Sequence, residues 1–140
     1  EIGYELGRIY AVSLKSSGFT ADVDVIMPVP LHPSKRRIRG FNQREYISAG
    51  VSDVTGLPVN TESLVRIVLS ATQTNRSRYE RWPNVEGIFR VAASDAIRGQ
   101  HILLLDDVIT TGSTIESCVN ELLKIEDVKV SVIAIACAVV

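Results

Sequence analysis

Two adjacent carboxylates, Asp106 and Asp107, precede a short run of hydroxyl side chains built around one glycine. The run consists of Thr110, Thr111, Gly112, Ser113 and Thr114. Hydroxyl groups donate hydrogen bonds and glycine allows a tight backbone turn, so this run suits a phosphate group. Carboxylates repel phosphate, but they accept hydrogen bonds from sugar hydroxyls or help to hold a divalent metal. A phosphate beside two acids therefore indicates a ligand of the ribose 5-phosphate type.

The residues on either side predict a strand and a helix that position these groups. Residues 102–105 are all aliphatic, which is typical of a strand buried on both faces, and we expect that strand to end at the acids. Apolar residues from Ile115 to Leu123 recur at offsets of three and four and predict a helix. Ser113 and Glu116 match a capping box, which would place phosphate at the helix start. A β-branched side chain at Gly112 would crowd this turn and resist a positive φ.

Three other interpretations fit parts of this pattern. An apolar strand ending in acids also occurs in P-loop NTPases, but their phosphate loop needs two glycines five positions apart, and no two of the nine glycines have that spacing. A receiver domain also groups acids at a strand end, but it needs a further Asp on a later strand and leaves the hydroxyl run unexplained. A strand, a polar turn and a capped helix without a ligand remain the third interpretation.

The segment from Leu103 to Thr114 resembles the phosphoribosyl-pyrophosphate (PRPP) signature of type I phosphoribosyltransferases. The resemblance implies an α/β fold with a mostly parallel central sheet, flanking helices, a small hood and a flexible loop. It also implies that Asp106 and Asp107 lie along the ribose hydroxyls and that residues 110–114 wrap the 5-phosphate. Mg²⁺ is the expected cofactor, bound together with PRPP, and the acceptor is not identified.

Two further segments are rich in cations. A strand predicted at residues 25–29 leads into a proline-stiffened loop where α/β proteins place their ligands, and we expect this loop to face pyrophosphate. Its candidate residues are Pro30, Lys35, Arg36, Arg37 and Arg39. A solvated basic loop and a short nucleic-acid patch are the alternatives.

Residues 70–83 contain no Val, Ile, Leu or Met, so they predict a polar loop that either closes over an anionic ligand or is simply mobile. The candidates in this flexible loop are Arg76, Arg78, Tyr79 and Arg81.

A narrower resemblance involves the same segments. Residues 28–33, 39–43 and the spaced polar positions from Leu64 to Phe89 resemble the ComF/GntX group of phosphoribosyltransferase-like proteins. That resemblance implies a link to DNA uptake during competence, with single-stranded DNA or the competence machinery as partners. It leaves open a PRPP-sensing or DNA-handling protein without turnover. Many ComF-like proteins begin with a cysteine-rich zinc ribbon, and this sequence has no such cysteines, so no zinc role is implied.

Composition predicts one ordinary globular domain over residues 1–140, located in the cytoplasm. The net charge is −1 and 46% of the residues are hydrophobic, which argues neither for nucleic acid nor for a membrane. The longest apolar run, residues 132–140, is far shorter than the ~20 residues of a membrane span. Cys118 and Cys137 are expected to be reduced core residues. Because the first residue is Glu1, we expect a fragment of a longer chain, and a homodimer remains open.

The remaining elements are predicted from periodicity and caps. Ile2, Leu6, Ile9 and Tyr10 predict an amphipathic helix over residues 2–16 that serves in packing. Gly3 and Gly7 have the G-x-x-x-G spacing, which carries almost no membrane meaning in so short and polar a helix. A helix capped by Asn42 is expected to run to Thr55. Further strands are expected at residues 63–69, 87–91 and 128–140, with a turn at 94–99.

Overall fold

The computed structural model of the protein describes residues 2–31, 42–67 and 88–138. The basic-loop candidates Lys35, Arg36, Arg37 and Arg39 lie outside the described residues. The flexible-loop candidates Arg76, Arg78, Tyr79 and Arg81 also lie outside them.

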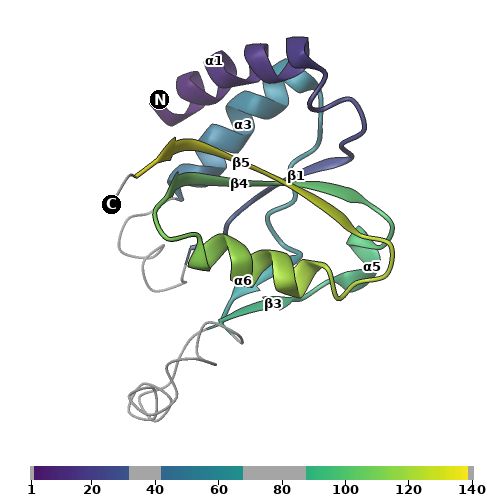
Figure 1. Cartoon of the computed structure of the whole chain (residues 1–140). Helices are drawn as coiled ribbons and strands as arrows, with labels where there is room; N and C mark the ends of the chain where they lie inside the picture. The colour runs from purple at the N-terminus through teal and green to yellow at the C-terminus, as the bar shows by residue number, and fades with distance from the viewer. Residues whose placement is uncertain (1, 32–41, 68–87, 139–140) are drawn as a thin grey trace.

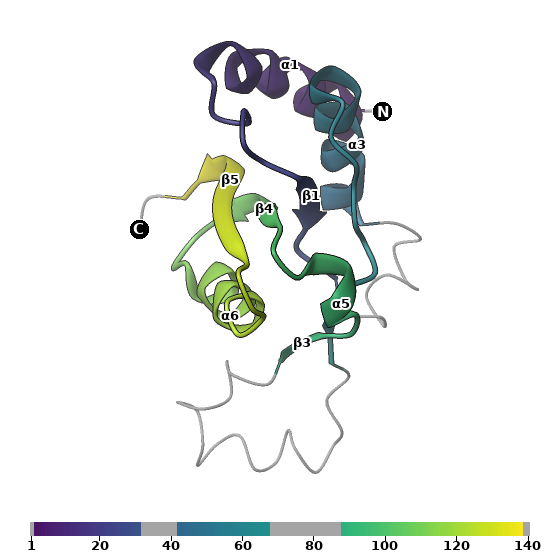
Figure 2. The same cartoon turned by 90° about the vertical axis from the view of Figure 1, so that its right-hand side faces the viewer.

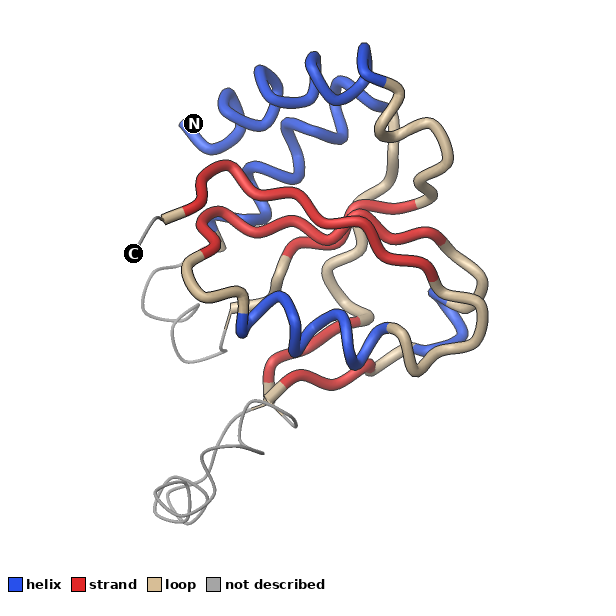
Figure 3. The backbone as a smooth tube through the Cα atoms, viewed as in Figure 1, coloured by secondary structure: helices blue, strands red, loops and turns tan. Residues whose placement is uncertain are grey.

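A parallel sheet of three strands forms the centre of the molecule, in the order β1–β4–β5 (Figures 1 and 3). The strands are β1 (Val25–Pro28), β4 (His101–Ile109) and β5 (Lys129–Cys137). The aliphatic residues 102–105 at the centre of β4 are fully buried, as expected for a strand covered on both faces. Helices flank the sheet, so the predicted α/β class is confirmed.

The acids lie within β4 and not after its end. The sequence predicts that the strand stops at Asp106, but β4 continues to Ile109 because its pairing with β5 also continues, from Asp106 opposite Ala134 to Ile109 opposite Cys137. Both carboxylates still lie in the carboxyl-terminal half of the strand. The loop at residues 110–112 follows directly and leads into the next helix.

The two faces of the sheet are covered by different elements (Figures 1 and 2). On one face lie α1 (Ile2–Ser17) and α3 (Gln43–Thr55). On the other face lie α6 (Ser113–Leu122) and an antiparallel hairpin of β2 (Leu64–Arg66) and β3 (Phe89–Val91), with the short helix α5 (Ser94–Ile97) beside them. Each face has its own apolar core. Within the described residues these elements agree with the predictions, with two exceptions. Val29, Ser63, Ile67, Ile88, Val128 and Ala138 flank the strands and are not part of them, and the turn at 94–99 contains a helical turn.

Helix α1 packs through its small residues and not through its large apolar ones. Gly3, Gly7, Ala11 and Leu14 are buried, whereas Ile2, Leu6, Ile9 and Val12 are exposed. A Cβ atom on Gly7 would lie 2.1 Å from the carbonyl oxygen of Ile47, and one on Gly50 would lie 2.1 Å from that of Tyr4. The predicted packing face is therefore wrong, because the glycine spacing brings the α1 and α3 backbones into contact.

Helix α3 begins and ends at the predicted residues. The Asn42 side chain accepts a hydrogen bond from the backbone N–H of Arg44 and donates one to the carbonyl of Val29. These two bonds cap the helix and attach its first turn to the end of β1. Gly56, with a φ of +78°, ends the helix in the left-handed conformation that favours glycine. None of the described helices is both long enough and apolar enough to cross a bilayer.

Candidate functional site

The centre of the site is an ion pair between β4 and α3. The Nε atom of Arg44 lies 2.6 Å from Oδ1 of Asp106 and 3.6 Å from Oδ1 of Asp107. The Asp106 side chain is almost completely buried, whereas that of Asp107 is 37% exposed. The two adjacent acids therefore differ: Asp106 anchors the arginine inside the protein, and Asp107 faces outward.

The environments of the acids shift their pKa values in opposite directions. Burial raises the pKa of Asp106, although the hydrogen bond and charge of Arg44 partly oppose that rise. Burial also acts to raise the pKa of Asp107, but the hydrogen bond with Asp106, the charge of Arg44 and the N–H of Val108 together lower it. Asp107 is consequently the stronger acid of the pair and the better acceptor for a ligand hydroxyl or a cation.

Sequence reasoning missed Arg44. It is the second residue of α3, and Asn42 fixes that first turn against the end of β1. Because β1 pairs with β4, with Pro28 opposite Leu105, the first turn of α3 is brought next to Asp106. The Asn42 cap was a usable signal for the helix start, but the pairing of β1 with β4 is needed to see which acid the arginine meets.

The loop after β4 has the conformation that its glycine permits. Gly112 has a φ of +88° and is the residue that precedes α6, with no side-chain capping bond. The predicted capping box is wrong, because Ser113 is the first helical residue. Its N–H donates to Oγ1 of Thr111, and the two hydroxyl oxygens lie 2.9 Å apart. The positive φ is confirmed, and a Cβ atom at Gly112 would meet no atom within 4 Å; crowding by a larger, β-branched side chain stays a prediction.

A small cavity of about 80 Å³ brings the loop together with one acid and the arginine. It is lined by Arg44, Asp106, Val108, Ile109, Thr110, Thr111, Gly112, Ser113, Thr114 and Ile115. All five predicted loop residues are present. Asp107 is not part of this lining. The cavity, which we call the loop cavity, offers hydroxyl and backbone donors at a helix start beside a cation, which is the chemistry that a phosphate group needs.

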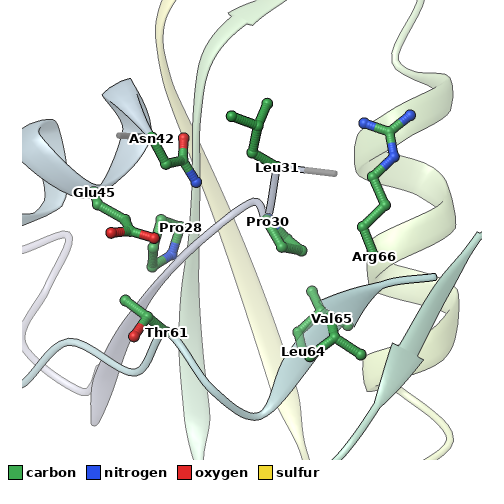
Figure 4. A pocket seen from close by; sticks show the side chains of 9 residues that line it. All are labelled: Pro28, Pro30, Leu31, Asn42, Glu45, Thr61, Leu64, Val65 and Arg66. Atoms are coloured by element: carbon green, nitrogen blue, oxygen red, sulfur yellow. The ribbon is translucent and has the colours of Figure 1, made fainter. Parts of the chain in front are cut away.

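A second cavity of about 260 Å³ lies beside the end of β1 (Figure 4). It is lined by Pro28, Pro30, Leu31, Asn42, Glu45, Thr61, Leu64, Val65 and Arg66. Pro30, the first predicted residue of the pyrophosphate loop, therefore lines a hollow beside the first turn of α3. We call this hollow the Pro30 cavity.

The carboxylates of Asp106 and Asp107 could help to hold a metal ion that arrives bound to a ligand, but they are too few to form a complete metal site by themselves. Among the described residues, no three His, Cys, Asp or Glu side chains group together in a way that could hold a metal ion. Asp106 and Asp107 offer carboxylate oxygens, which Mg²⁺ prefers, and Mg²⁺ commonly completes its shell with ligand phosphates and water.

The two cysteines are free thiols with different environments. Cys118 is buried in α6, and this burial raises its pKa to about 12. Cys137 is exposed at the last residue of β5, so its predicted place in the core is wrong. Its neighbour Ala136 is exposed as well, and successive side chains of a strand point to opposite faces, so neither face of β5 is covered at its end.

Comparison with known protein families shows which family the chain belongs to. A model of the phosphoribosyl transferase domain matches residues 49–140, which include β4, the loop cavity residues 106–115 and β5. The chain is a ComF-like member of the type I phosphoribosyltransferase family. The match begins within α3, so this ComF-like chain carries the family's pattern through most of the described site.

Curated relatives of this ComF-like chain place it within the family more narrowly. The DNA utilization protein YhgH of Escherichia coli K12 is 30% identical over 127 residues, which cover 89% of this chain and 55% of that protein. Competence protein F of Haemophilus influenzae is 32% identical over 111 residues, which cover 76% of this chain and 48% of that protein. The chain spans about half the length of the curated relatives it matches.

Solved structures confirm the fold. The glutamine PRPP amidotransferase of B. subtilis, complexed with ADP and GMP, superposes with a TM-score of 0.66 at 19% identity over 95% of this ComF-like chain and 26% of that chain. A purine phosphoribosyltransferase from Pyrococcus horikoshii superposes with a TM-score of 0.57 at 13% identity, over 97% of this chain and 76% of that one. At these identities the likeness concerns the type I phosphoribosyltransferase fold alone.

Proposed function

We propose that this ComF-like protein binds PRPP together with Mg²⁺ and transfers its ribose 5-phosphate group to an acceptor, with release of pyrophosphate. The observation that carries the proposal is the loop cavity, where Asp106 and all five residues of the hydroxyl loop line one hollow. The loop residues take the 5-phosphate. Asp107, which is exposed, and Asp106 take the ribose hydroxyls and the ligand-bound metal.

Arg44 has two roles in this proposal. In the free protein it neutralises the acid pair, since it lies 2.6 Å from Asp106. When the ribose hydroxyls engage the carboxylates, the guanidinium is free to turn toward the phosphate, because Arg44 also lines the loop cavity. Arg44 would thereby replace its ion pair with Asp106 by an ion pair with the 5-phosphate and stay within the site.

The chemistry that follows is charge stabilisation. The bond between the anomeric carbon and the pyrophosphate oxygen breaks, its electron pair leaves with pyrophosphate, and positive charge builds up on the sugar. The acceptor then forms its bond to the anomeric carbon and loses a proton to solvent. Asp106 and Asp107 lie on the side of the ribose hydroxyls, where their negative charge favours that developing cation. Asp106 and Asp107 would hold the Mg²⁺ that arrives with PRPP, and that ion would supply Lewis-acid stabilisation of the leaving group.

A second candidate function is PRPP sensing or single-stranded DNA handling without turnover. The names of the relatives, which refer to DNA utilization and competence, favour it. We propose a role of this chain in DNA uptake on the same basis. A cytoplasmic location and a homodimer remain predictions.

Calorimetry on folded variants tests the binding part of the proposal. Asp106→Asn combined with Asp107→Asn should weaken Mg²⁺-PRPP by tenfold or more while sparing or improving inorganic phosphate, since the acids repel phosphate and serve sugar and metal. Asp95→Asn, at an exposed acid of α5, is the matched control and should change neither. Unchanged PRPP affinity in the double variant would contradict the proposed site.

A turnover screen separates the two candidate functions. Pyrophosphate release from PRPP that depends on an added base or amine supports the transferase. Binding of PRPP without release, or salt-sensitive binding of single-stranded DNA, supports the second candidate.

Replacing Arg36, Arg37 and Arg39 with Ala should weaken the binding of pyrophosphate and PRPP more than the binding of ribose 5-phosphate, and this loss of affinity should shrink as the salt concentration rises. Equal loss of all three ligands would argue against a separate pyrophosphate loop.

A further inference from the structure

Arg44 occupies the acid pair in the free protein. Its Nε atom lies 2.6 Å from Oδ1 of Asp106, and only 18% of the Arg44 side chain and 4% of the Asp106 side chain are exposed. The same Oδ1 atom also accepts the backbone N–H of Asp107, 2.8 Å away. A charge-assisted hydrogen bond in so buried a place is strong, because little water competes for either group. A ligand hydroxyl that takes this oxygen as its acceptor therefore competes with the guanidinium.

The guanidinium of Arg44 can move without the helix that carries it. Asn42 caps α3 and donates a hydrogen bond to the carbonyl of Val29, just after β1, so the backbone of the first turn is anchored. The Arg44 side chain lines the loop cavity together with Asp106 and the hydroxyl loop at residues 110–114. The cavity is only about 80 Å³ in volume, so an anion inside it lies close to the guanidinium. The carboxylate of Asp106 and such an anion therefore compete for one cation.

This competition couples two binding events. An anion in the loop cavity draws the guanidinium toward itself and weakens its bond to Asp106, which can then accept a ribose hydroxyl at lower cost. By thermodynamic linkage, a ribose diol on the acids strengthens the binding of the anion by the same factor. Without the anion, a diol has to separate a buried ion pair and leave the cation without its partner, which is unfavourable. A ligand that carries both groups avoids that cost.

We propose that Arg44 is a specificity-determining residue that makes the acid pair available only to a ligand whose anion occupies the loop cavity. The inference rests on the proposed function, in which the loop residues take the 5-phosphate and the acids take the ribose hydroxyls. Arg44 thereby selects ribose 5-phosphates against free ribose and unphosphorylated nucleosides, which present the same hydroxyls. This role goes beyond the attraction of a cation for phosphate, because Arg44 also weakens the binding of every ribose that lacks the phosphate.

Free ribose, titrated with and without sulfate, tests the coupling in the full wild-type chain. Sulfate stands in for the 5-phosphate, and ribose is neutral, so direct charge attraction between the two probes does not contribute. Saturating sulfate should strengthen the binding of ribose, followed by NMR titration, by about fivefold or more, which is the lower end of typical couplings between ligand sites. A ribose affinity that sulfate leaves unchanged would overturn the inference.

Arg44→Gln separates the proposed role from two simpler ones. The variant should bind ribose 5-phosphate about tenfold or more weakly, because a charged donor to the phosphate is lost. It should nevertheless bind free ribose more tightly than the wild type, and without dependence on sulfate. Weaker ribose 5-phosphate with unchanged ribose would make Arg44 a plain phosphate ligand, and a loss of both ligands would mean that it only supports Asp106. Either of these results overturns the inference.

Arg98→Gln is the matched control. Arg98 also lies 2.6 Å from an aspartate, Asp95, but it lines neither the loop cavity nor the Pro30 cavity. Its replacement should therefore change neither the affinity for ribose 5-phosphate nor the effect of sulfate on ribose. If Arg44→Gln does not fold, Arg44→Met replaces it, and the wild-type measurement with sulfate needs no variant.

Failure of the inference can be distinguished from failure of the proposed function. A wild-type chain that binds ribose 5-phosphate and Mg²⁺-PRPP but shows no effect of sulfate on ribose overturns the inference and leaves the proposed function in place. A chain that shows the effect of sulfate and loses it in Arg44→Gln, but binds no Mg²⁺-PRPP, supports the role of Arg44 and refutes the proposed function alone.

Discussion

Replacing Gly112 with Ala tests whether the loop at residues 110–114 needs a positive φ at position 112 in order to bind phosphate. The residue has a φ of +88°, and an added Cβ atom would meet nothing within 4 Å, so the substitution changes backbone preference without creating a contact. A non-glycine residue in the left-handed region costs about 1–2 kcal/mol. Since Thr110 and Thr111 are exposed and Gly112 is half-buried, we expect the Ala variant to relax to a negative φ when free and to regain the positive φ only on binding.

That cost converts into an affinity change that calorimetry can resolve. At about 1.4 kcal/mol per factor of ten, phosphate and ribose 5-phosphate should bind roughly 5- to 30-fold more weakly to Gly112→Ala, with little change in melting temperature. Gly56→Ala is the matched control, because Gly56 has a φ of +78° and equally open space but lies at the end of α3 away from the loop. It should lower the melting temperature and leave affinity unchanged. Equal affinity losses in both variants, or none in Gly112→Ala, would refute the argument.

Three other measurements test the site and the fold. Arg44→Gln removes the guanidinium that lowers the pKa of Asp106, so the pH below which ligand binding is lost should move upward, as a titration of affinity between pH 4 and 8 would show. In the native protein at pH 8, a thiol reagent should modify Cys137 and spare Cys118, whose pKa is about 12, and Cys137→Ser should abolish that fast reaction. Gly50→Ala should lower the melting temperature by about 5 °C or more, because its Cβ atom would meet the α1 backbone; an unchanged value would mean that the helices separate freely.

The grouping of Asp106 with the hydroxyl loop at the start of a helix was predictable from the sequence because it is local. The acids, the hydroxyl loop and its glycine are consecutive, and the positive φ of Gly112 follows from the turn that they must make. The α/β class was predictable for the same reason, since buried strands and amphipathic helices each show their own period. The helix cap at Asn42 is equally local, and its predicted role is confirmed.

Features that depend on which elements pack together could not be predicted. Arg44 meets Asp106 across a long separation in the chain, and only the pairing of β1 with β4 brings them together. The extension of β4 past the acids depends on its partner β5. For α1, hydrophobicity indicated one face and the structure buries another, because two backbones can approach closely only where side chains are absent. Hydrophobic periodicity indicates which side chains avoid water. It does not indicate where two helix backbones can approach closely.

The glycine contact between α1 and α3 also affects how variation in this chain should be interpreted. The atoms nearest to a Cβ at Gly7 or Gly50 belong to Tyr4, Arg8, Ile47 and Gly50, none of which lines either cavity. The first turn of α3, however, carries Arg44 and is capped by Asn42, which do line the cavities. In a saturation mutagenesis screen scored by ligand binding, both glycines would therefore rank among intolerant positions, beside the loop itself. A map of intolerant positions drawn from such a screen would extend along α1, and a ligand site inferred from that map alone would be placed too close to the exposed helix.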